Sequence, residues 1–226
     1  MLCDVDNAMA ALCRGTTIRF ATEDVGKAMD TILCGQADKE PLTVRERAIF
    51  ERWRAPKRQS EWLAGRRAAK RVLCAILALD DPRSVEVGRL DTGAPVVHGH
   101  GNVVVSISHA GDVAIAVAAQ FSVGVDVELD ESRPKCLWNA VLCRAEQEKL
   151  AHVQEHDRDH EGNRLWTSKE AISKVGGWGA TKNFKTIDCS VNPVWVEGRA
   201  IHHRCAAVDG YVITLAQEAT MGTDHG

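Results

Sequence analysis

Two carboxylates stand two residues apart in the segment Ser122–Glu128, which reads Ser-Val-Gly-Val-Asp-Val-Glu. Side chains alternate between the two faces of a β-strand, so Asp126 and Glu128 share one face and the valines occupy the other. Neighbouring carboxylates repel each other and need a compensating cation. Mg²⁺ takes ligands of this kind, usually one or two carboxylates together with substrate phosphate. The alternative is an edge strand with a solvated acidic face.

A second group of polar residues lies on one face of the helix predicted over Asn163–Gly177. Trp166, Glu170 and Lys174 follow one another at intervals of four residues, which places them on the same side of a helix. The opposite stripe is apolar and contains Leu165, Ile172 and Val175. In the simpler interpretation, Glu170 and Lys174 form a surface ion pair.

A third segment, Ser106-Ile-Ser108-His109-Ala-Gly111, ends a predicted strand and begins a turn. The turn's backbone N–H groups and His109 could meet a phosphate, because glycine allows close approach of the backbone. The sequence places no third member of a catalytic triad beside Ser108 and His109.

A basic segment contrasts with the formal net charge of −3. Residues Arg45–Arg71 contain ten Lys/Arg and three Glu, a local charge of about +7. A short basic patch on an acidic chain favours a compact polyanionic ligand over a nucleic acid, since stacking aromatics are limited to Trp53 and Trp62. A solvated, arginine-rich helix face is the alternative.

The spacing of apolar residues predicts the elements that position these groups. Helices are expected over 42–54 (ended by Pro56), 60–79 (capped by Ser60), 144–155 and 165–175, with a polar loop between the last two. Strands are expected over 16–20, 85–90, 103–109, 113–119, 122–128, 184–190, 194–197, 201–208 and 211–216. This order predicts an α+β fold of two similar lobes, residues 1–121 and 122–226, each a small antiparallel sheet with packed helices. Residues 1–40 give little indication of their role.

The composition is that of a soluble globular protein, with 45% hydrophobic and 26% charged residues. The sequence has no signal-peptide pattern and no apolar run long enough to span a membrane. Its eight cysteines contain no Cys-x-x-Cys pair, which favours reduced thiols over disulfides or zinc. We therefore expect a cytoplasmic protein with no membrane or nucleic-acid partner.

Together, the motifs resemble the 4′-phosphopantetheinyl transferase superfamily, in its surfactin-synthetase-type branch. Gly124-Val-Asp126-Val-Glu128 is similar to the family's Gly-(Ile/Val)-Asp-x-Glu strand, and Trp166–Lys174 to its Trp-x-x-Lys-Glu-Ala-x-x-Lys helix. Ser108-His109 resembles the upstream Ser-His element. The segment Arg58–Arg66 resembles the Arg-x-x-Glu-Phe-Leu-Ala-Gly-Arg stretch of the enterobactin-synthetase-like members.

The resemblance implies Mg²⁺-dependent transfer of the phosphopantetheine arm of coenzyme A to a serine of an acyl or peptidyl carrier protein, with release of adenosine 3′,5′-bisphosphate. By the same resemblance, Asp126, Glu128 and Glu170 hold the metal, and Glu170 also takes the serine proton. Lys174 binds the coenzyme phosphates. Arg58 and Arg66 bind the 3′-phosphate, and Ser108 and His109, the latter as a cation, complete the coenzyme site.

The sequence departs from the family pattern at Gly93-Ala94-Pro95, where many relatives have Gly-Lys-Pro. One coenzyme-binding lysine is therefore missing. The resemblance implies a monomer, and it leaves the siderophore, polyketide, nonribosomal peptide and fatty-acid pathways open.

Two other classes of function are kept. One is an inactive homologue that binds coenzyme A or a nucleotide as a regulatory protein. The other is a zinc-binding module at His152, His156 and His160, which lie four residues apart. Gly162 and the polar residues around these histidines favour a solvated loop instead.

Overall fold

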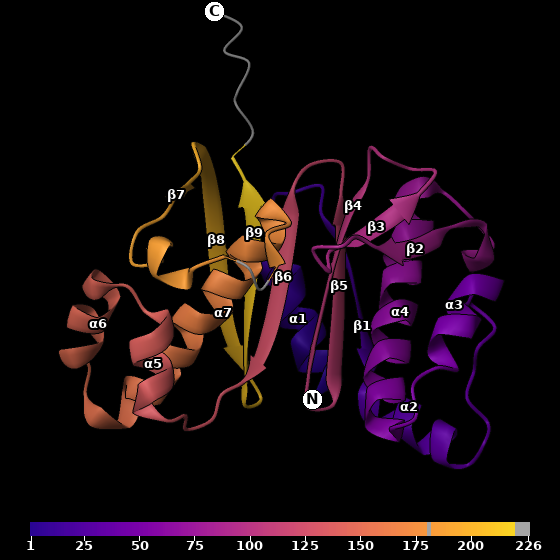
Figure 1. Ribbon diagram of the computed structural model, residues 1–226, viewed down its shortest axis with the longest axis horizontal. Helices are drawn as coiled ribbons and strands as arrows, with labels where there is room; N and C mark the ends of the chain where they lie inside the picture. Colours follow the sequence, from indigo (N-terminus) through magenta and orange to yellow (C-terminus); the bar gives the residue numbers. More distant parts are fainter. Residues whose placement is uncertain (180–181, 220–226) are drawn as a thin grey trace, which may run out of the picture.

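The computed structural model describes residues 1–179 and 182–219, so the end of the expected second lobe, residues 220–226, lies outside the described part (Figure 1). The first half contains α1 (Leu2–Leu12), β1 (Arg19–Asp24), α2 (Val25–Leu33), α3 (Val44–Phe50), α4 (Pro56–Leu77), the 3-10 helix η1 (Pro82–Ser84), β2 (Glu86–Arg89), β3 (Pro95–His98), β4 (Val104–Ala110) and β5 (Val113–Ala119). The second half contains β6 (Val123–Leu129), α5 (Lys135–Val141), α6 (Arg144–Ala151), the 3-10 helix η2 (Glu155–Asp157), α7 (Arg158–Gly176), the 3-10 helix η4 (Phe184–Thr186), β7 (Val194–Val196), β8 (Arg199–Val208) and β9 (Tyr211–Glu218).

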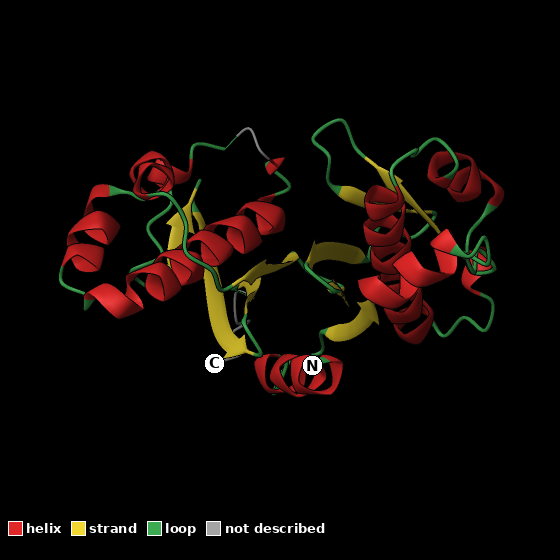
Figure 2. Ribbon diagram, turned by 90° about the horizontal axis from the view of Figure 1, so that it is seen from below, coloured by secondary structure: helices red, strands yellow, loops and turns green. Residues whose placement is uncertain are grey.

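The strands form antiparallel sheets in the orders β1-β5-β4, β2-β3 and β6-β9-β8-β7. The prediction of an α+β fold is confirmed. After α1, the first half passes from β1 through three α-helices to β4 and β5, which pair antiparallel beside β1. The second half passes from β6 through three α-helices to β8 and β9, which pair antiparallel beside β6. The long helices α4 and α7 each cover a sheet of their own half (Figure 2). Among the described helices, none is long and apolar enough to cross a membrane.

Each half also contains one fully buried ion pair of the same construction. Lys70 Nζ on α4 lies 2.7 Å from Glu46 of α3, and Lys169 Nζ on α7 lies 2.6 Å from Glu146 of α6. Each lysine also donates to two backbone carbonyls, Lys70 to Pro82 and Val85, and Lys169 to Phe184 and Ile187. Each glutamate accepts from two backbone N–H groups, Glu46 from Thr43 and Val87, and Glu146 from Cys143 and Cys189. The halves therefore resemble each other in side-chain contacts as well as in element order.

Helix α1 joins the two sheets on one side of the molecule, where Figure 2 shows it lying across both. Its residues Val5 and Met9 are buried in a core that includes apolar side chains of β5, β6 and β9. Asp6 accepts a hydrogen bond of 2.6 Å from Thr22 on β1, and the Leu12 carbonyl accepts one of 3.3 Å from Arg204 on β8. The N-terminal residues, for which the sequence indicated no role, thus bridge the two halves.

The predicted boundaries were wrong around Pro56. The structure ends α3 at Phe50 and begins α4 at Pro56, where Ser60 lies inside the helix and donates to the Lys57 carbonyl. Proline lacks an N–H and has a helical φ, so it fits the first turn of a helix as well as it ends one.

Two further predictions in the second half were wrong. The expected strand over 184–190 is the 3-10 helix η4 and a turn, because carbonyls of this segment accept from Lys169 instead of a neighbouring strand. The expected polar loop ends early, since α7 begins at Arg158, and a Cβ at Gly162 would lie 2.6 Å from Trp138. Glycine here lets α7 pack closely against α5.

Candidate active site

Strands β4 and β6 belong to different sheets, and serine side chains join them at the centre of the molecule. The N–H of Val125 donates to Ser106 Oγ over 3.1 Å, and the N–H of Val127 donates to Ser108 Oγ over 3.3 Å. Ser108 Oγ in turn donates to Asp126 Oδ1 over 2.7 Å. The alternation that places both serines on one face is confirmed. Ser108 also orients Asp126, one of the three carboxylates of the candidate site.

Asp126 is only 4% exposed, and its two oxygens have different surroundings. Oδ1 accepts from Ser108 and, over 2.8 Å, from Lys174 Nζ. Oδ2 is buried with no hydrogen-bond partner among the described residues. A buried carboxylate oxygen without a partner is costly, so this atom fits a cation.

Helix α7 approaches β6 closely because of Gly124. A Cβ at this position would lie 2.1 Å from the Ala171 carbonyl oxygen, which is far shorter than any real contact. The apolar stripe predicted for this helix is buried, with Leu165, Ile172 and Val175 in one core. The opposite face therefore carries Glu170 and Lys174 against β6. The glycine of the strand motif thus positions the residues of the helix motif.

Lys174 already has three acceptors in the structure. Besides Asp126, its ammonium donates to the carbonyls of Val125 over 3.0 Å and Ile107 over 3.3 Å. It therefore joins β6 to β4 and neutralises Asp126. The predicted contact of Lys174 with coenzyme phosphates stays a prediction.

Glu128 is held by two donors. Trp166 Nε1 donates to its Oε1 over 3.0 Å, and Arg133 Nη2 lies 2.9 Å from its Oε2. Arg133, which precedes α5, also donates to Asn163 Oδ1 over 2.9 Å. Burial and the charge of Asp126 nevertheless raise the pKa of Glu128 above its ordinary value. Sequence reasoning missed Arg133, because no motif or periodicity connects it with Glu128.

Glu170 has the most strongly perturbed carboxyl group of this cluster. Burial raises its pKa to about 7, and the charges of Asp126 and Glu128 act in the same direction, while Lys174 opposes them. The three carboxylates are therefore close enough to repel one another. The side-chain oxygens of Asp126, Glu128 and Glu170 do not all lie within 4.8 Å of one another. Among the described residues, the one group of His, Cys, Asp or Glu ligand atoms that meets this distance is Cys143, Glu146 and Asp188.

The pKa of Glu170 makes stability depend on pH. Between its ordinary value of 4.5 and about 7, the folded protein keeps a proton on Glu170 that the unfolded chain releases. The free energy of unfolding of the metal-free protein should therefore fall as the pH rises through this window, by up to about 3 kcal/mol from this group. Urea denaturation in EDTA at several pH values measures this slope. Glu170→Gln should flatten it, and an unchanged slope in the variant would contradict the assignment.

His109 follows Ser108 on β4 and lines a cavity of about 190 Å³. Burial lowers the pKa of His109, and the positive charges of Lys174 and Arg58 act in the same direction, while Glu61 opposes them. A cationic His109 thus requires a bound anion that raises its pKa again. Its predicted role as a cation stays a prediction.

Arg66 and Arg58, both on α4, have different positions. Arg66 lines the same cavity as His109, with its guanidinium 4.8 Å from the Trp62 ring centroid. Arg58 is exposed, lies 5.3 Å from the centroid of Trp53 and is absent from the residues that line the cavity. The structure therefore does not bring Arg58 and Arg66 into one pocket. Arg58 lies about two turns nearer the start of α4 than Arg66.

A second cavity, of about 510 Å³, lies between the two halves of the chain. Its lining includes Pro95, Ser106 and Ile107 from the first half, and Glu170 and Lys174 from α7. The two cavities share residues of the β2–β3 turn and Ile107. The two cavities therefore adjoin. The smaller one is lined by residues of α4, and the larger one by Glu170.

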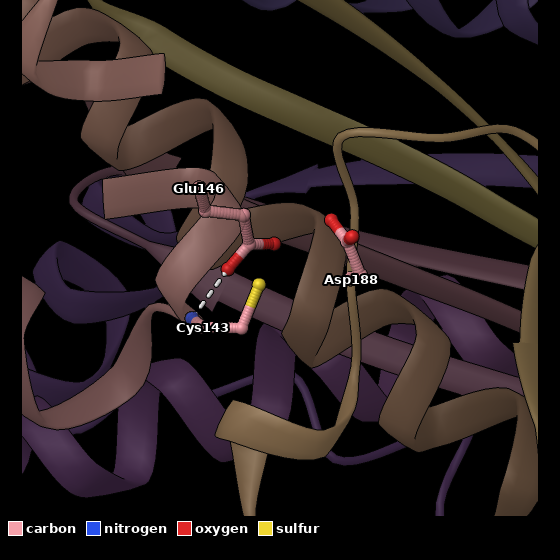
Figure 3. Close-up of side chains that lie close together, drawn as sticks. All are labelled: Cys143, Glu146 and Asp188. Atoms are coloured by element: carbon pink, nitrogen blue, oxygen red, sulfur yellow. Dashed lines mark hydrogen bonds between the residues drawn. The ribbon is translucent and has the colours of Figure 1, made fainter. Parts of the chain in front are cut away.

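The compact cluster Cys143, Glu146 and Asp188 is structural (Figure 3). Both Glu146 oxygens already accept hydrogen bonds from backbone N–H groups, and Lys169 neutralises the carboxylate. Burial raises the pKa of the Cys143 thiol, which opposes the thiolate that a metal would need.

The three histidines of the zinc alternative fall in different elements. His152 follows α6, His156 lies in η2, and His160 lies in α7, where its Nδ1 is 2.6 Å from Asp130 Oδ2. The three do not share one helix face, because the chain turns twice between them. In the described part of the chain, the group of potential metal ligands whose atoms lie within 4.8 Å of one another is Cys143, Glu146 and Asp188, and it contains none of these histidines.

Comparison with known proteins adds two family matches. Residues 122–216 match the model of the 4′-phosphopantetheinyl transferase superfamily, and residues 45–119 match the model of the 4′-phosphopantetheinyl transferase N-terminal domain. The chain belongs to the 4′-phosphopantetheinyl transferase superfamily. Its membership in the surfactin-synthetase-type branch stays a prediction.

Two curated relatives of this superfamily are the 4′-phosphopantetheinyl transferases AcpT of Escherichia coli O157:H7 and of Escherichia coli strain K12. Each is 29% identical to the chain over 126 residues, 54% of this chain and 60% of the relative. The chain thus spans less than two thirds of the length of the curated relatives it matches.

Solved structures with local likeness include two of this superfamily. The holo-[acyl-carrier-protein] synthase of Thermotoga maritima is 19% identical, with a TM-score of 0.38, over 44% of this chain and 64% of that one. The holo-ACP-synthase of Plasmodium yoelii is 21% identical, with a TM-score of 0.38, over 45% of this chain and 90% of that one.

Proposed function

We propose that this protein transfers the 4′-phosphopantetheine arm of coenzyme A to a serine hydroxyl of an acyl or peptidyl carrier protein. In this reaction the serine oxygen forms a bond with the phosphorus next to the pantetheine. The bond from that phosphorus to the bridging oxygen breaks, and adenosine 3′,5′-bisphosphate leaves.

One observation carries the proposal: three carboxylates repel one another, and one of their oxygens, Asp126 Oδ2, is buried without a hydrogen-bond partner among the described residues. The cavity that Glu170 lines also has Arg89, Lys174 and Arg199 in its lining. Asp126, Glu128 and Glu170 would together hold Mg²⁺, whose preferred ligands are oxygens. When bound, the ion would offset charge that builds on the transferred and leaving phosphates.

The chain's own residues would contribute proton transfer and positioning. Glu170 would accept the proton of the serine hydroxyl. Its pKa of about 7 is that of the site without metal, and bound Mg²⁺ would lower it, so that the carboxylate is ionised at neutral pH. Lys174 fixes Asp126 through Oδ1 and leaves Oδ2 free. Ser108 orients the same carboxylate from the opposite half of the chain. This preorganisation reduces the rearrangement that the reaction requires.

A single chain supplies both sides of this site, because β4 comes from the first half and β6 and α7 come from the second. On this basis we propose two lobes, residues 1–121 and 122–226, in an enzyme that acts as a monomer. We also propose that it is cytoplasmic, because its sequence has no signal-peptide pattern. The pathway of its carrier stays open among the siderophore, polyketide, nonribosomal peptide and fatty-acid types.

An intact-mass assay tests the proposed function. The purified protein is incubated with coenzyme A, Mg²⁺ and a panel of apo carrier proteins, and a carrier should gain the mass of one phosphopantetheine. EDTA should abolish the gain. Coenzyme A binding without transfer to any carrier would instead support the alternative, an inactive binding homologue.

In the unaltered protein, the guanidinium of Arg133 should weaken metal binding, because it competes with the metal ion for Glu128 Oε2. Loss of one nearby positive charge in Arg133→Gln should tighten the binding of Mn²⁺, used as a spectroscopic substitute for Mg²⁺, by about 3- to 10-fold. Electron paramagnetic resonance titration measures this without turnover. Arg144→Gln, which removes an exposed arginine paired with Glu148, is the matched control. Weaker binding in Arg133→Gln would mean that Arg133 positions Glu128 instead of competing for it.

A further inference from the structure

Asn163 is a fully buried amide on α7, one turn before Trp166. Its Oδ1 accepts from Arg133 Nε over 2.9 Å. Its Nδ2 donates to Asp130 Oδ1 over 3.1 Å and to the Glu131 carbonyl over 2.8 Å. The amide oxygen and both amide hydrogens therefore have partners, and these partners fix the orientation of the side chain.

The partners of Asn163 all belong to the short loop of residues 130–134, which connects β6 to α5. His160, one turn earlier on α7, contacts the same loop, with its Nδ1 2.6 Å from Asp130 Oδ2. The backbone N–H of Asp130 donates to the Gly210 carbonyl over 2.8 Å. Helix α7 thus holds this loop through side chains on two successive turns.

Arg133 connects the loop to the carboxylates of the candidate site. Its Nη2 lies 2.9 Å from Glu128 Oε2 and 3.6 Å from Glu131 Oε1. The other oxygen of Glu128 accepts from Trp166 over 3.0 Å. Because a guanidinium group is planar and rigid, a partner on Nε sets the direction in which Nη2 points. Asn163 therefore aims Arg133 at Glu128.

This restraint strengthens the contact between Arg133 and Glu128. A long side chain that is free to rotate loses rotamer freedom when it pairs with a carboxylate, and that loss weakens the pair. Asn163 restricts the guanidinium before the pair forms. Without Asn163, Arg133 could turn to Glu131, whose side chain is 54% exposed. Arg133 would then compete less strongly for Glu128.

We propose that Asn163 is a positioning residue that holds Arg133 against Glu128 and thereby lowers the affinity of the carboxylates for a divalent cation. Asn163 acts through Arg133 and is not itself a ligand. The inference rests on the proposed function, in which Asp126, Glu128 and Glu170 hold the metal. It means that a buried amide outside the carboxylate group sets the metal concentration that the enzyme needs.

A double-mutant cycle on the full chain tests this, with Mn²⁺ affinity measured by electron paramagnetic resonance titration. Asn163→Leu replaces the amide with an apolar group of similar size, and it should tighten Mn²⁺ binding by about 2- to 5-fold. In the Arg133→Gln background, the same substitution should change the affinity by less than about 1.5-fold, because the group that Asn163 positions is already absent.

The matched control is Thr167→Val. Thr167 is a buried polar residue of the same helix that donates to the Asn163 carbonyl and has no contact with Arg133. It should leave Mn²⁺ affinity unchanged even if it lowers stability. A cooperative urea transition shows that each variant is folded. If Asn163→Leu does not fold, Asn163→Ala takes its place in the cycle, since it adds no methyl groups to the core.

The outcomes separate the inference from the function on which it rests. Weaker Mn²⁺ binding in Asn163→Leu, no change, or an equal change with and without Arg133 would overturn the role of Asn163. Failure of the unaltered protein to bind Mn²⁺ would overturn the metal site of the proposed function. Mn²⁺ binding with the expected coupling, but without transfer to any carrier, would overturn the proposed function and leave the role of Asn163 standing.

Discussion

Replacement of Asp126 by asparagine should lower the rate of phosphopantetheine transfer by about 1,000-fold or more, because charge stabilisation is the main catalytic contribution in phosphoryl transfer. The substitution keeps the shape of the side chain and removes the charge around Oδ2, the buried oxygen without a partner. It also leaves Lys174 without its anion. The intact-mass assay, run as a time course with a carrier that the unaltered protein modifies, measures the loss.

A second measurement separates this loss from misfolding. The unaltered protein should gain thermal stability on addition of Mg²⁺, and Asp126→Asn should lose most of that gain while it keeps a cooperative transition. Asp209→Asn is the matched control, since Asp209 lies at the β8–β9 turn and contacts the N-terminal ammonium group. A normal transfer rate in Asp126→Asn would refute the metal assignment.

Replacement of Lys169 by methionine should reduce the free energy of unfolding by about 3–5 kcal/mol, as expected when one partner of a buried ion pair is removed. Glu146 is fully buried, and the loss of Lys169 leaves its charge with backbone donors alone. Urea denaturation at neutral pH measures the change.

The repeated construction of the two halves supplies the control for this prediction. Lys70→Met removes the equivalent cation from Glu46, so it should cost a similar amount. The double variant Lys169→Met/Glu146→Gln should recover much of the loss, because the uncompensated charge is removed. A cost below about 1 kcal/mol for Lys169→Met alone would contradict a role for this pair in stability.

Helix and strand types were predictable for most of the second half, where the apolar period is clear. The alternating valines of β6 and the stripe containing Leu165 and Ile172 are buried as expected. Boundaries were less predictable. Pro56 is compatible with either end of a helix, and the sequence around it does not distinguish the two.

The first forty residues were not predictable because their apolar positions face two sheets at once. Val5 and Met9 are fully buried, and the core that they join includes strands β5, β6 and β9, which lie more than 100 residues away in the chain. Local propensity contains no information about such distant partners. The position of α1 across the two sheets is thus a property of the tertiary structure.

The sequence by itself determined where the candidate site residues lie: Asp126 and Glu128 on one strand face, and Glu170 and Lys174 on one helix face. Periods of two and of 3.6 residues are local, so a linear pattern is sufficient to predict them. The tertiary structure alone decided how these groups are held, through Ser108 from the other half and Arg133 from a separate loop. It also decided that Arg89, and not Arg58, shares a cavity with Arg66. Burial, hydrogen-bond partners and pKa values depend on atoms that are close in space, and the chain brings those atoms together only when it folds.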